Sequence, residues 1–175
     1  GLGAMGLGGA PLLEILDRMG ARVEVEDAEL GGAEPSGSLR VSGAELNGTE
    51  VGGAEVPLAI DELPLVALAA CFAEGTTVIR DAEELRRKES DRIETVTSGL
   101  RALGVRIRST DDGFRVRGVP ARPRGGAMDS GGDHRIAMLG AVAGLVSREG
   151  VRVGGAEAVS VSFPGFYDLL ESVAE

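Results

Sequence analysis

Apolar and polar residues follow one another along the chain with two different periods. Residues 12–19 and 93–103 space their apolar side chains three or four positions apart, which predicts amphipathic helices that end at Gly20 and Gly104. Other segments alternate apolar and polar residues one by one, which predicts half-buried strands. These segments are residues 22–26, 38–42, 105–108 and 114–118. Between the first two strands, the Gly-, Pro- and Ser-rich residues 31–37 predict a loop.

Two further predicted helices are apolar on all sides. The first opens at Asp61-Glu62 and runs to Phe72, and the second opens at residues 133–135 and runs to Val146. Each is followed by a short predicted strand, at residues 76–80 and 151–153. A helix that lacks a polar face is stable in water only when other elements cover it, so both helices are expected in the core.

The order of these elements repeats along the chain. A helix, a Leu-Gly or Met-Gly pair, a strand, a loop or turn and a second strand occur at 12–42 and again at 93–118. We therefore predict an α/β (α+β) fold of repeated βαβαββ units, with mixed sheets around buried helices and the first unit lacking its front part. One domain is expected over 11–175 after a leader or linker at 1–10, with a last helix from Ser162 to about residue 173.

Composition and charge narrow the class of protein. Hydrophobic residues make up 43% of the chain and charged residues 26%, as in ordinary globular proteins. No apolar stretch reaches the ~18 residues of a membrane span, and residues 1–9 lack the basic start of a secretory signal. The single cysteine, Cys71, excludes an internal disulfide and fits a reducing cytoplasm. The net charge of −10 argues against nucleic acid and anionic membranes as partners.

Polar clusters mark the beginnings of four predicted helices. They are Asp61-Glu62, Lys88 to Arg92, Asp133 to Arg135, and Ser162. A helix start offers free N–H groups and the positive end of a dipole, so it binds anions. Stacked repeats would bring several starts to one face, where Lys88, Arg92 and Arg135 would lie beside three carboxylates. Such cations suit phosphates and carboxylates, and the neighbouring acids could transfer protons.

Each cluster also has a structural interpretation. Asp61 and Ser162 could simply cap their helices, and residues 86–92 could form a solvated helix start with local ion pairs. His134 could be a structural histidine, and Cys71 a small buried hydrophobe. No Cys/His spacing indicates a metal, and the glycines match neither a phosphate-binding nor a dinucleotide-binding loop.

Four segments together resemble the C-terminal domain of 5-enolpyruvylshikimate-3-phosphate synthases. They are Ile60-Asp61-Glu62-Leu63-Pro64, Arg87-Lys88-Glu89-Ser90-Asp91-Arg92, Gly132-Asp133-His134-Arg135-Ile136-Ala137-Met138 and Ser162-Phe163-Pro164. They occur in the order and approximate spacing of that family, and the likeness extends from about residue 12 to the end. The second and third segments are the most specific.

The resemblance implies a fold and a reaction. The family fold has two globular halves, each of three βαβαββ units, which together form an inside-out α/β barrel with the active site in the cleft. The reaction moves the enolpyruvyl group of phosphoenolpyruvate to the 5-hydroxyl of shikimate 3-phosphate and releases phosphate. It belongs to the biosynthesis of aromatic amino acids and needs no cofactor.

The resemblance also implies roles for particular residues. Asp61 matches the carboxylate that contacts the shikimate hydroxyls and is proposed as proton acceptor. Lys88 matches a ligand of shikimate 3-phosphate, and Glu89 matches the acid proposed to protonate the methylene carbon of phosphoenolpyruvate. Arg92 and Arg135 match the arginines that hold phosphoenolpyruvate. The reaction brings together two phosphates and two carboxylates, so it requires several fixed cations.

Two further residues are expected to support a substrate-binding arginine, and two positions depart from the family pattern. Asp133 and His134 flank Arg135 and are expected to orient it. Val161 stands where some members have a lysine that contacts phosphoenolpyruvate, and Glu84 stands where some have asparagine.

Family chains are more than twice as long as this one, and the Lys-Ser, Gly-Asn-Ala-Gly-Thr and Ser-Ser-Gln motifs of their N-terminal part do not occur here. We therefore expect a fragment that has little activity without its N-terminal half. Three alternatives stay open: a UDP-N-acetylglucosamine enolpyruvyl transferase, against which the Lys-Glu-Ser-Asp-Arg segment argues, a module that only binds anions, and a purely structural repeat domain.

Overall fold

The computed structural model describes residues 11–29 and 36–174. The expected leader at 1–10 and most of the expected loop at 31–37 lie outside the described residues. Residues 36 and 37 belong to a strand, so the loop ends earlier than the sequence predicts.

Helices and strands alternate through most of the described chain. The α-helices are α1 (Pro11–Arg18), α2 (Val56–Ala59), α3 (Leu63–Ala70), α4 (Arg92–Ala102), α5 (His134–Val146) and α6 (Phe166–Val173). Short 3-10 helices are η1 (Gly53–Glu55), η2 (Glu83–Arg87) and η3 (Ala156–Val161). The strands are β1 (Arg22–Glu29), β2 (Ser36–Ser42), β3 (Glu50–Val51), β4 (Thr76–Ile79), β5 (Arg106–Thr110), β6 (Gly113–Arg117), β7 (Gly126–Asp129) and β8 (Val151–Gly154).

The strands form three small sheets. β1 and β2 make an antiparallel hairpin, and β7 pairs with β8 in parallel. The third sheet has the order β3-β4-β6-β5 and is mixed, because β3 and β4 are parallel whereas β6 is antiparallel to both of its neighbours. The elements β3-α3-β4-α4-β5-β6 thus form one complete βαβαββ unit, which confirms the predicted mixed α/β repeat.

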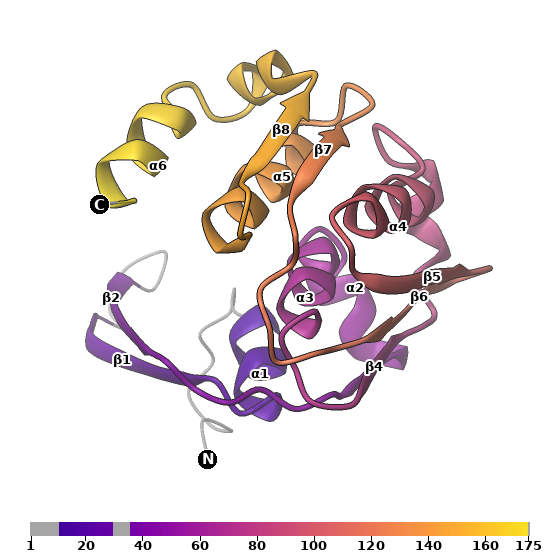
Figure 1. Cartoon of the computed structure of the whole chain (residues 1–175). Helices are drawn as coiled ribbons and strands as arrows, with labels where there is room; N and C mark the ends of the chain where they lie inside the picture. The colour runs from indigo at the N-terminus through magenta and orange to yellow at the C-terminus, as the bar shows by residue number, and fades with distance from the viewer. Residues whose placement is uncertain (1–10, 30–35, 175) are drawn as a thin grey trace.

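The helix α3 lies at the centre of the fold, as its apolar sequence predicts. It contacts α1, α4 and α5 and packs against β4 and β6. Figure 1 shows it enclosed by these helices, with the sheets towards the outside. Six of its eight residues are buried, and α5 contributes Ile136, Leu139 and Ala143 to the same core. Burial of these apolar side chains holds the units together.

The last helix begins later than the sequence predicts. Residues from Ala156 to Val161 form η3, and Ser162 ends that turn instead of capping α6. Pro164 disfavours helical backbone at the residue before it, and Gly165 adopts a left-handed conformation with φ of +84°. The helix therefore starts at Phe166, and the prediction that Ser162 caps it is wrong.

No helix among residues 11–29 and 36–174 combines the length and the apolar character that crossing a bilayer requires.

Candidate active site

The first residues of three helices meet at one end of the fold. The helices α3, α4 and α5 contact one another in pairs. Asp91 caps α4 by accepting a hydrogen bond from the backbone N–H of Glu94, and Asp133 caps α5 by accepting one from Arg135. The positive ends of the helix dipoles therefore point to the same place, and they carry the predicted site residues with them.

Arg92 is the central cation of this site. Its side chain is only 1% exposed, and Asp133, which is 0% exposed, holds it with two oxygens. Nε donates to Oδ2 of Asp133 at 2.8 Å and Nη2 donates to Oδ1 at 3.3 Å. Arg92 also donates to Asp61 through Nη1 at 2.8 Å and to Glu89 through Nη2. Three carboxylates therefore fix the orientation of one buried guanidinium, whose charge would otherwise be costly.

Asp61 faces three cations from the turn between α2 and α3. Its carboxylate lies 2.8 Å from Nη1 of Arg92, 3.4 Å from Nη2 of Arg135 and 3.8 Å from Nζ of Lys88. The N-cap residue of α3 is Glu62, and no side chain caps the helix there. The capping interpretation of Asp61 is therefore wrong, and its carboxylate serves the cationic cluster instead.

The residues around Lys88 complete the site. Nζ of Lys88 donates to Oε1 of Glu84 at 2.6 Å, so the residue at this variable family position pairs with the predicted phosphate ligand. Ser90, for which no role is predicted from the sequence, donates to Oδ2 of Asp133 at 3.0 Å. Its position inside the Lys-Glu-Ser-Asp-Arg segment was the only signal that could have found it.

Burial and pairing have opposite effects on the ionisation of the central pair. Burial disfavours the charge on Arg92, but hydrogen bonds and charges from Asp133 and the charge of Glu89 outweigh it, so the pKa of Arg92 is raised. Burial likewise opposes the charge of Asp133, but Arg92 and the hydroxyl of Ser90 bring the pKa of Asp133 below its usual range. The hydrogen bond to Glu84 raises the pKa of Lys88. All three groups are therefore charged at neutral pH.

Two predicted residues lie outside this network of contacts. The imidazole of His134 is partly buried and takes part in no hydrogen bond or ion pair within residues 11–29 and 36–174. Ser162 is exposed, and its backbone N–H donates to Val159. Asp133 contacts the backbone N–H of Arg135 rather than its guanidinium. The expectation that Asp133 and His134 orient the Arg135 side chain stays a prediction.

The structural interpretation of residues 86–92, a helix start with local ion pairs, holds for part of the segment. Arg86 pairs locally with Asp91 at 2.8 Å and Glu94 at 3.4 Å, and all three are partly exposed. Arg86 also donates to the backbone carbonyls of Thr110 and Asp111. Arg92 differs because it is buried and pairs with the carboxylates of Asp133 and Asp61 in other segments. The segment therefore combines a solvated helix start with a site residue.

Comparison with known proteins identifies the family. The family model described as EPSP synthase (3-phosphoshikimate 1-carboxyvinyltransferase) matches residues 6–170. The chain belongs to the EPSP synthase family. This match favours the interpretation of the chain as part of an EPSP synthase over that of a UDP-N-acetylglucosamine enolpyruvyl transferase.

Named EPSP synthases resemble the chain along most of its length. The 3-phosphoshikimate 1-carboxyvinyltransferase of Thermotoga sp. (strain RQ2) is 53% identical over 93% of this chain and 38% of its own length. The enzyme of the same name from Roseiflexus sp. (strain RS-1) is 50% identical over 93% of this chain and 37% of its own length. The chain thus spans less than two fifths of these relatives.

Solved structures share the fold. An EPSP synthase from Acinetobacter baumannii superposes with a TM-score of 0.86 at 39% identity, covering 93% of this chain and 38% of that one. The enolpyruvyl transferase NikO from Streptomyces tendae gives a TM-score of 0.73 at 26% identity, covering 94% and 35%. Both likenesses confirm the predicted enolpyruvyl transferase fold.

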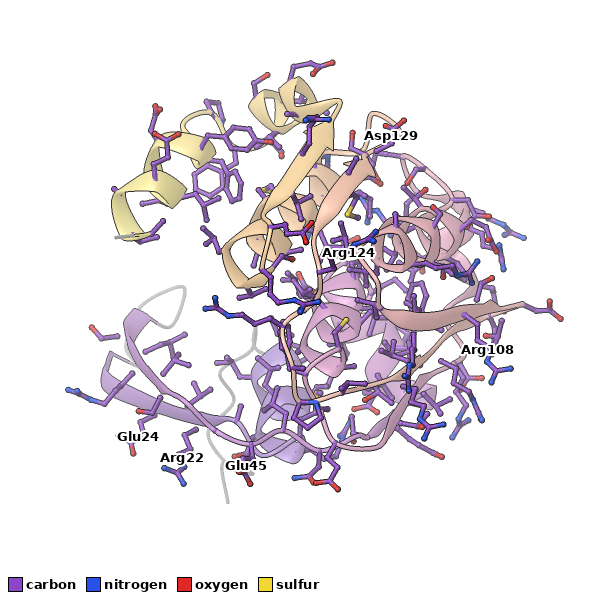
Figure 2. The ribbon with its side chains drawn as sticks, in the orientation of Figure 1. Arg22, Glu24, Glu45, Arg108, Arg124 and Asp129 are labelled. Atoms are coloured by element: carbon purple, nitrogen blue, oxygen red, sulfur yellow. The ribbon has the colours of Figure 1, made fainter. Side chains whose placement is uncertain are left out.

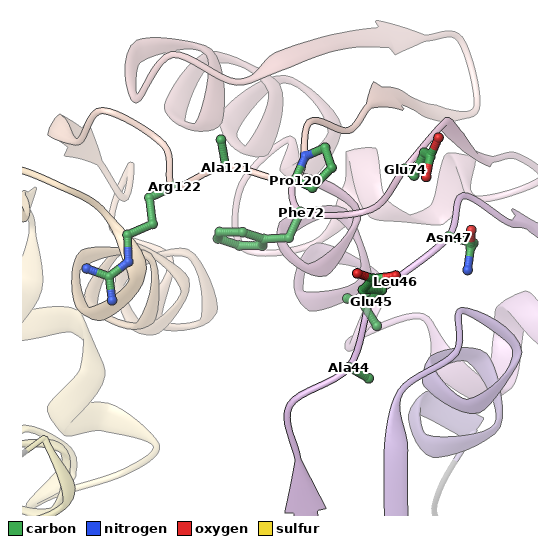
Figure 3. Close-up of a pocket in the computed structure, with 9 residues that line it drawn as sticks. All are labelled: Ala44, Glu45, Leu46, Asn47, Phe72, Glu74, Pro120, Ala121 and Arg122. Carbon is green, nitrogen blue, oxygen red and sulfur yellow. The ribbon is translucent and has the colours of Figure 1, made fainter.

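A hollow of about 480 Å³ lies near the C-terminal end of α3, away from the site just described (Figure 3). Its lining consists of Ala44, Glu45, Leu46, Asn47, Phe72, Glu74, Pro120, Ala121 and Arg122. None of the predicted site residues lines it. The hollow includes Phe72, just beyond the last residue of α3, whereas Asp61 lies just before the first residue of that helix. Among the described residues, no group of three His, Cys, Asp or Glu side chains is arranged to hold a metal ion.

Proposed function

We propose that this chain supplies one wall of the active site of an EPSP synthase, which transfers the enolpyruvyl group of phosphoenolpyruvate to shikimate 3-phosphate. The observation that supports it most directly is the position of Asp61 between Arg92, Arg135 and Lys88. Three cations around one partly exposed carboxylate suit a reaction with anionic substrates and a proton transfer.

The cations divide between the two substrates. Arg92 and Arg135 bind phosphoenolpyruvate, and Lys88 binds shikimate 3-phosphate. Asp133 takes two of the five N–H donors of Arg92, those on Nε and Nη2, and thereby fixes the plane of the guanidinium. The Nη1 and Nη2 groups face Asp61 and Glu89 on the partly exposed side of the site. An incoming carboxylate or phosphate displaces Glu89 from Nη2 and leaves its carboxyl group facing the substrate.

The two exposed acids transfer the protons. Glu89 protonates the methylene carbon of phosphoenolpyruvate, which makes the neighbouring carbon electrophilic. The 5-hydroxyl of shikimate 3-phosphate attacks that carbon and gives its proton to Asp61. The resulting methyl group then returns a proton to the Glu89 carboxylate as the carbon–oxygen bond to phosphate breaks. The enolpyruvyl double bond forms again, and phosphate leaves.

Binding to the isolated chain is the first test. Isothermal titration calorimetry with phosphoenolpyruvate compares the chain with Arg135→Gln and with Arg152→Gln, an exposed arginine on β8. We expect Arg135→Gln to weaken binding by about tenfold or more, because a charge-assisted hydrogen bond is lost, and Arg152→Gln to leave it unchanged. Equal effects of the two substitutions would contradict the assignment of Arg135.

Turnover is the second test, because the anion-binding alternative also predicts binding. The chain replaces the corresponding 38% of the Thermotoga sp. (strain RQ2) relative, and phosphate release is measured with both substrates. A chimera that folds, binds both substrates and releases no phosphate would favour an anion-binding module over an enzyme half. The chain alone should bind without turnover, because it lacks the remaining substrate contacts.

A further inference from the structure

The C-terminal ends of α3, α4 and α5 lie opposite the candidate active site and border a second pocket. Cys71 follows α3, Gly104 lies just beyond α4, and Arg148 lies just beyond α5, and all three line a cavity of about 230 Å³. The connection from β6 to β7 closes another side of it. The cavity therefore lies beyond the C-terminal ends of the same three helices whose first residues meet at the candidate active site.

Five arginines line this cavity. They are Arg106, Arg117, Arg122, Arg124 and Arg148. No aspartate or glutamate is part of the lining. Within residues 11–29 and 36–174, none of the five guanidinium groups takes part in an ion pair or a hydrogen bond. The cations of the candidate active site differ, because each of them has a carboxylate partner.

The clustering of like-charged arginines lowers the stability of the fold. Arg106 and Arg117 face each other directly across the β5–β6 hairpin, and Arg108 and Arg115 do the same two residues further on. Like charges in opposite positions of an antiparallel pair destabilise it. The chain has 28 acidic against 18 basic residues, so acidic partners were available in the sequence. Folding stability thus does not account for five cations around one cavity that have no carboxylate partner in the described part of the chain.

Compensation of helix dipoles explains only part of the cluster. A cation near the C-terminal end of a helix is favourable, and Arg148 fits that description. Arg106 and Arg117 belong to strands, and Arg122 and Arg124 belong to the connection between β6 and β7. In the view of Figure 3, Arg122 lies on the other side of Phe72 from Glu74 and Asn47, away from the acidic part of the neighbouring hollow. A ligand explains all five positions together.

The size and charge of the cavity indicate the class of ligand. Guanidinium groups bind phosphate oxygens in bidentate geometry, and five of them match an anion with several negative charges. A volume of about 230 Å³ lies below the ~300–1,000 Å³ of pockets that enclose drug-sized molecules. We propose that this cavity binds a compact polyphosphate anion, such as inorganic tripolyphosphate or the phosphate tail of a nucleotide. The proposal is independent of the function proposed for the other end of the helices.

The experiment compares two pairs of substitutions in the same hairpin. Sodium tripolyphosphate is titrated calorimetrically, without divalent cations, into the chain, Arg106→Gln/Arg117→Gln and Arg108→Gln/Arg115→Gln. Each pair removes two facing arginines from β5 and β6, but only the first lines the cavity. In Figure 2, Arg124 lies on the segment that enters β7, whereas Arg108 lies on the β5–β6 hairpin, away from that segment. Thermal melts should show that neither pair lowers Tm.

We expect the cavity pair to weaken tripolyphosphate binding by about tenfold or more and the outer pair by less than about threefold. Equal losses would indicate diffuse electrostatic attraction and overturn the proposal. So would absence of binding, as expected if an acidic protein segment is the true partner of the arginines. A loss with Arg135→Gln but not with the cavity pair would place the anion at the candidate active site and would also overturn it.

Titrations with inorganic phosphate and with ATP distinguish between the possible phosphate ligands of the cavity. Inorganic phosphate should bind at least about tenfold more weakly than tripolyphosphate, because it engages fewer guanidinium groups. ATP that binds as tightly as tripolyphosphate, with the same sensitivity to the cavity pair, would identify a nucleotide tail as an acceptable ligand. ATP that binds much more weakly would restrict the site to inorganic polyphosphate. Phosphate that binds as tightly as tripolyphosphate would contradict the polyphosphate class.

Discussion

Asp133 at the beginning of α5 holds Arg92 at the beginning of α4, with Nε and Oδ2 2.8 Å apart and both side chains removed from solvent. The two residues are 41 positions apart in sequence. Their pairing ties two helix starts together and fixes a guanidinium that also reaches Asp61. The same contact therefore supports both the packing of the helices and the proposed binding of anionic substrates.

Removal of the Asp133 carboxylate should destabilise the fold. Asp133→Ala leaves the buried charge of Arg92 without its main partner, and we expect a loss of about 3–5 kcal/mol in the free energy of unfolding, measured by urea titration. Glu94→Gln, which breaks the exposed pair with Arg86, should change this free energy by less than about 1 kcal/mol. Similar losses in the two variants would mean that the buried Arg92–Asp133 pair contributes no more to the free energy of unfolding than an exposed pair does.

The same pair predicts a pH dependence of stability. The pKa of Asp133 lies below its ordinary value of about 3.9, so its contribution to stability is present above that pH and is lost as the pH falls through the folded-state value. The free energy of unfolding should therefore begin to decrease as the pH falls below about 5 and should continue to decrease until the pH is below the folded-state pKa of Asp133. Ser90→Ala removes one hydrogen bond to this carboxylate, so the pKa of Asp133 should lie closer to its ordinary value. The decrease in the free energy of unfolding at low pH should therefore be smaller in this variant.

A second carboxylate provides the control for this pH series. The backbone N–H of Asp81 lowers the pKa of Asp112, which therefore contributes to acid sensitivity in the same direction. Asp112→Asn should remove the contribution of Asp112 to acid sensitivity. The difference in acid sensitivity between chains with and without Ser90→Ala should remain the same in this background. If that difference vanishes with Asp112→Asn, the acid sensitivity does not come from Asp133.

Asp61 should matter for turnover. In the chimera with the Thermotoga relative, Asp61→Asn removes the proposed proton acceptor, and kcat for phosphate release should fall by about 10²–10⁴-fold. Glu62→Gln removes the neighbouring carboxylate, which lies 3.7 Å from Nη1 of Arg135, and should change kcat by less than about tenfold. An unchanged kcat for Asp61→Asn would show that another group accepts the proton.

Gly113 should tolerate no side chain, because the strands approach each other closely at that point. A Cβ atom there would overlap the carbonyl oxygen of Ile79 on β4, the next strand of the mixed sheet. Gly113→Ala should lower the free energy of unfolding by about 1–3 kcal/mol or more, as overpacking does. Gly43→Ala, with nothing within 4 Å of the added atom, should change it by less than about 1 kcal/mol. Equal effects in urea titrations would contradict the close approach of β4 and β6.

Local sequence predicted the longer elements well. The helix at 93–103 and the hairpin at 105–118 follow from apolar periodicity, and α3 and α5 follow from their apolar character. Two of the strands, β3 and β7, were not predicted from the sequence. The strand β3 has only two residues, and β7 has four residues in a Gly-rich segment in which apolar and polar residues do not alternate. Such short strands exist because a neighbouring strand pairs with them, and pairing with a distant segment leaves no local pattern.

The sequence by itself determined the family, the repeat of helix and strand, and the residue types at the helix starts. Only the tertiary structure decided that Asp61 serves three cations instead of a helix cap, that Asp133 holds Arg92, and that five arginines gather at the opposite end of the helices. The physical reason is that periodicity along a chain specifies which face of an element is buried. Which distant side chains then meet depends on how the buried faces pack in three dimensions.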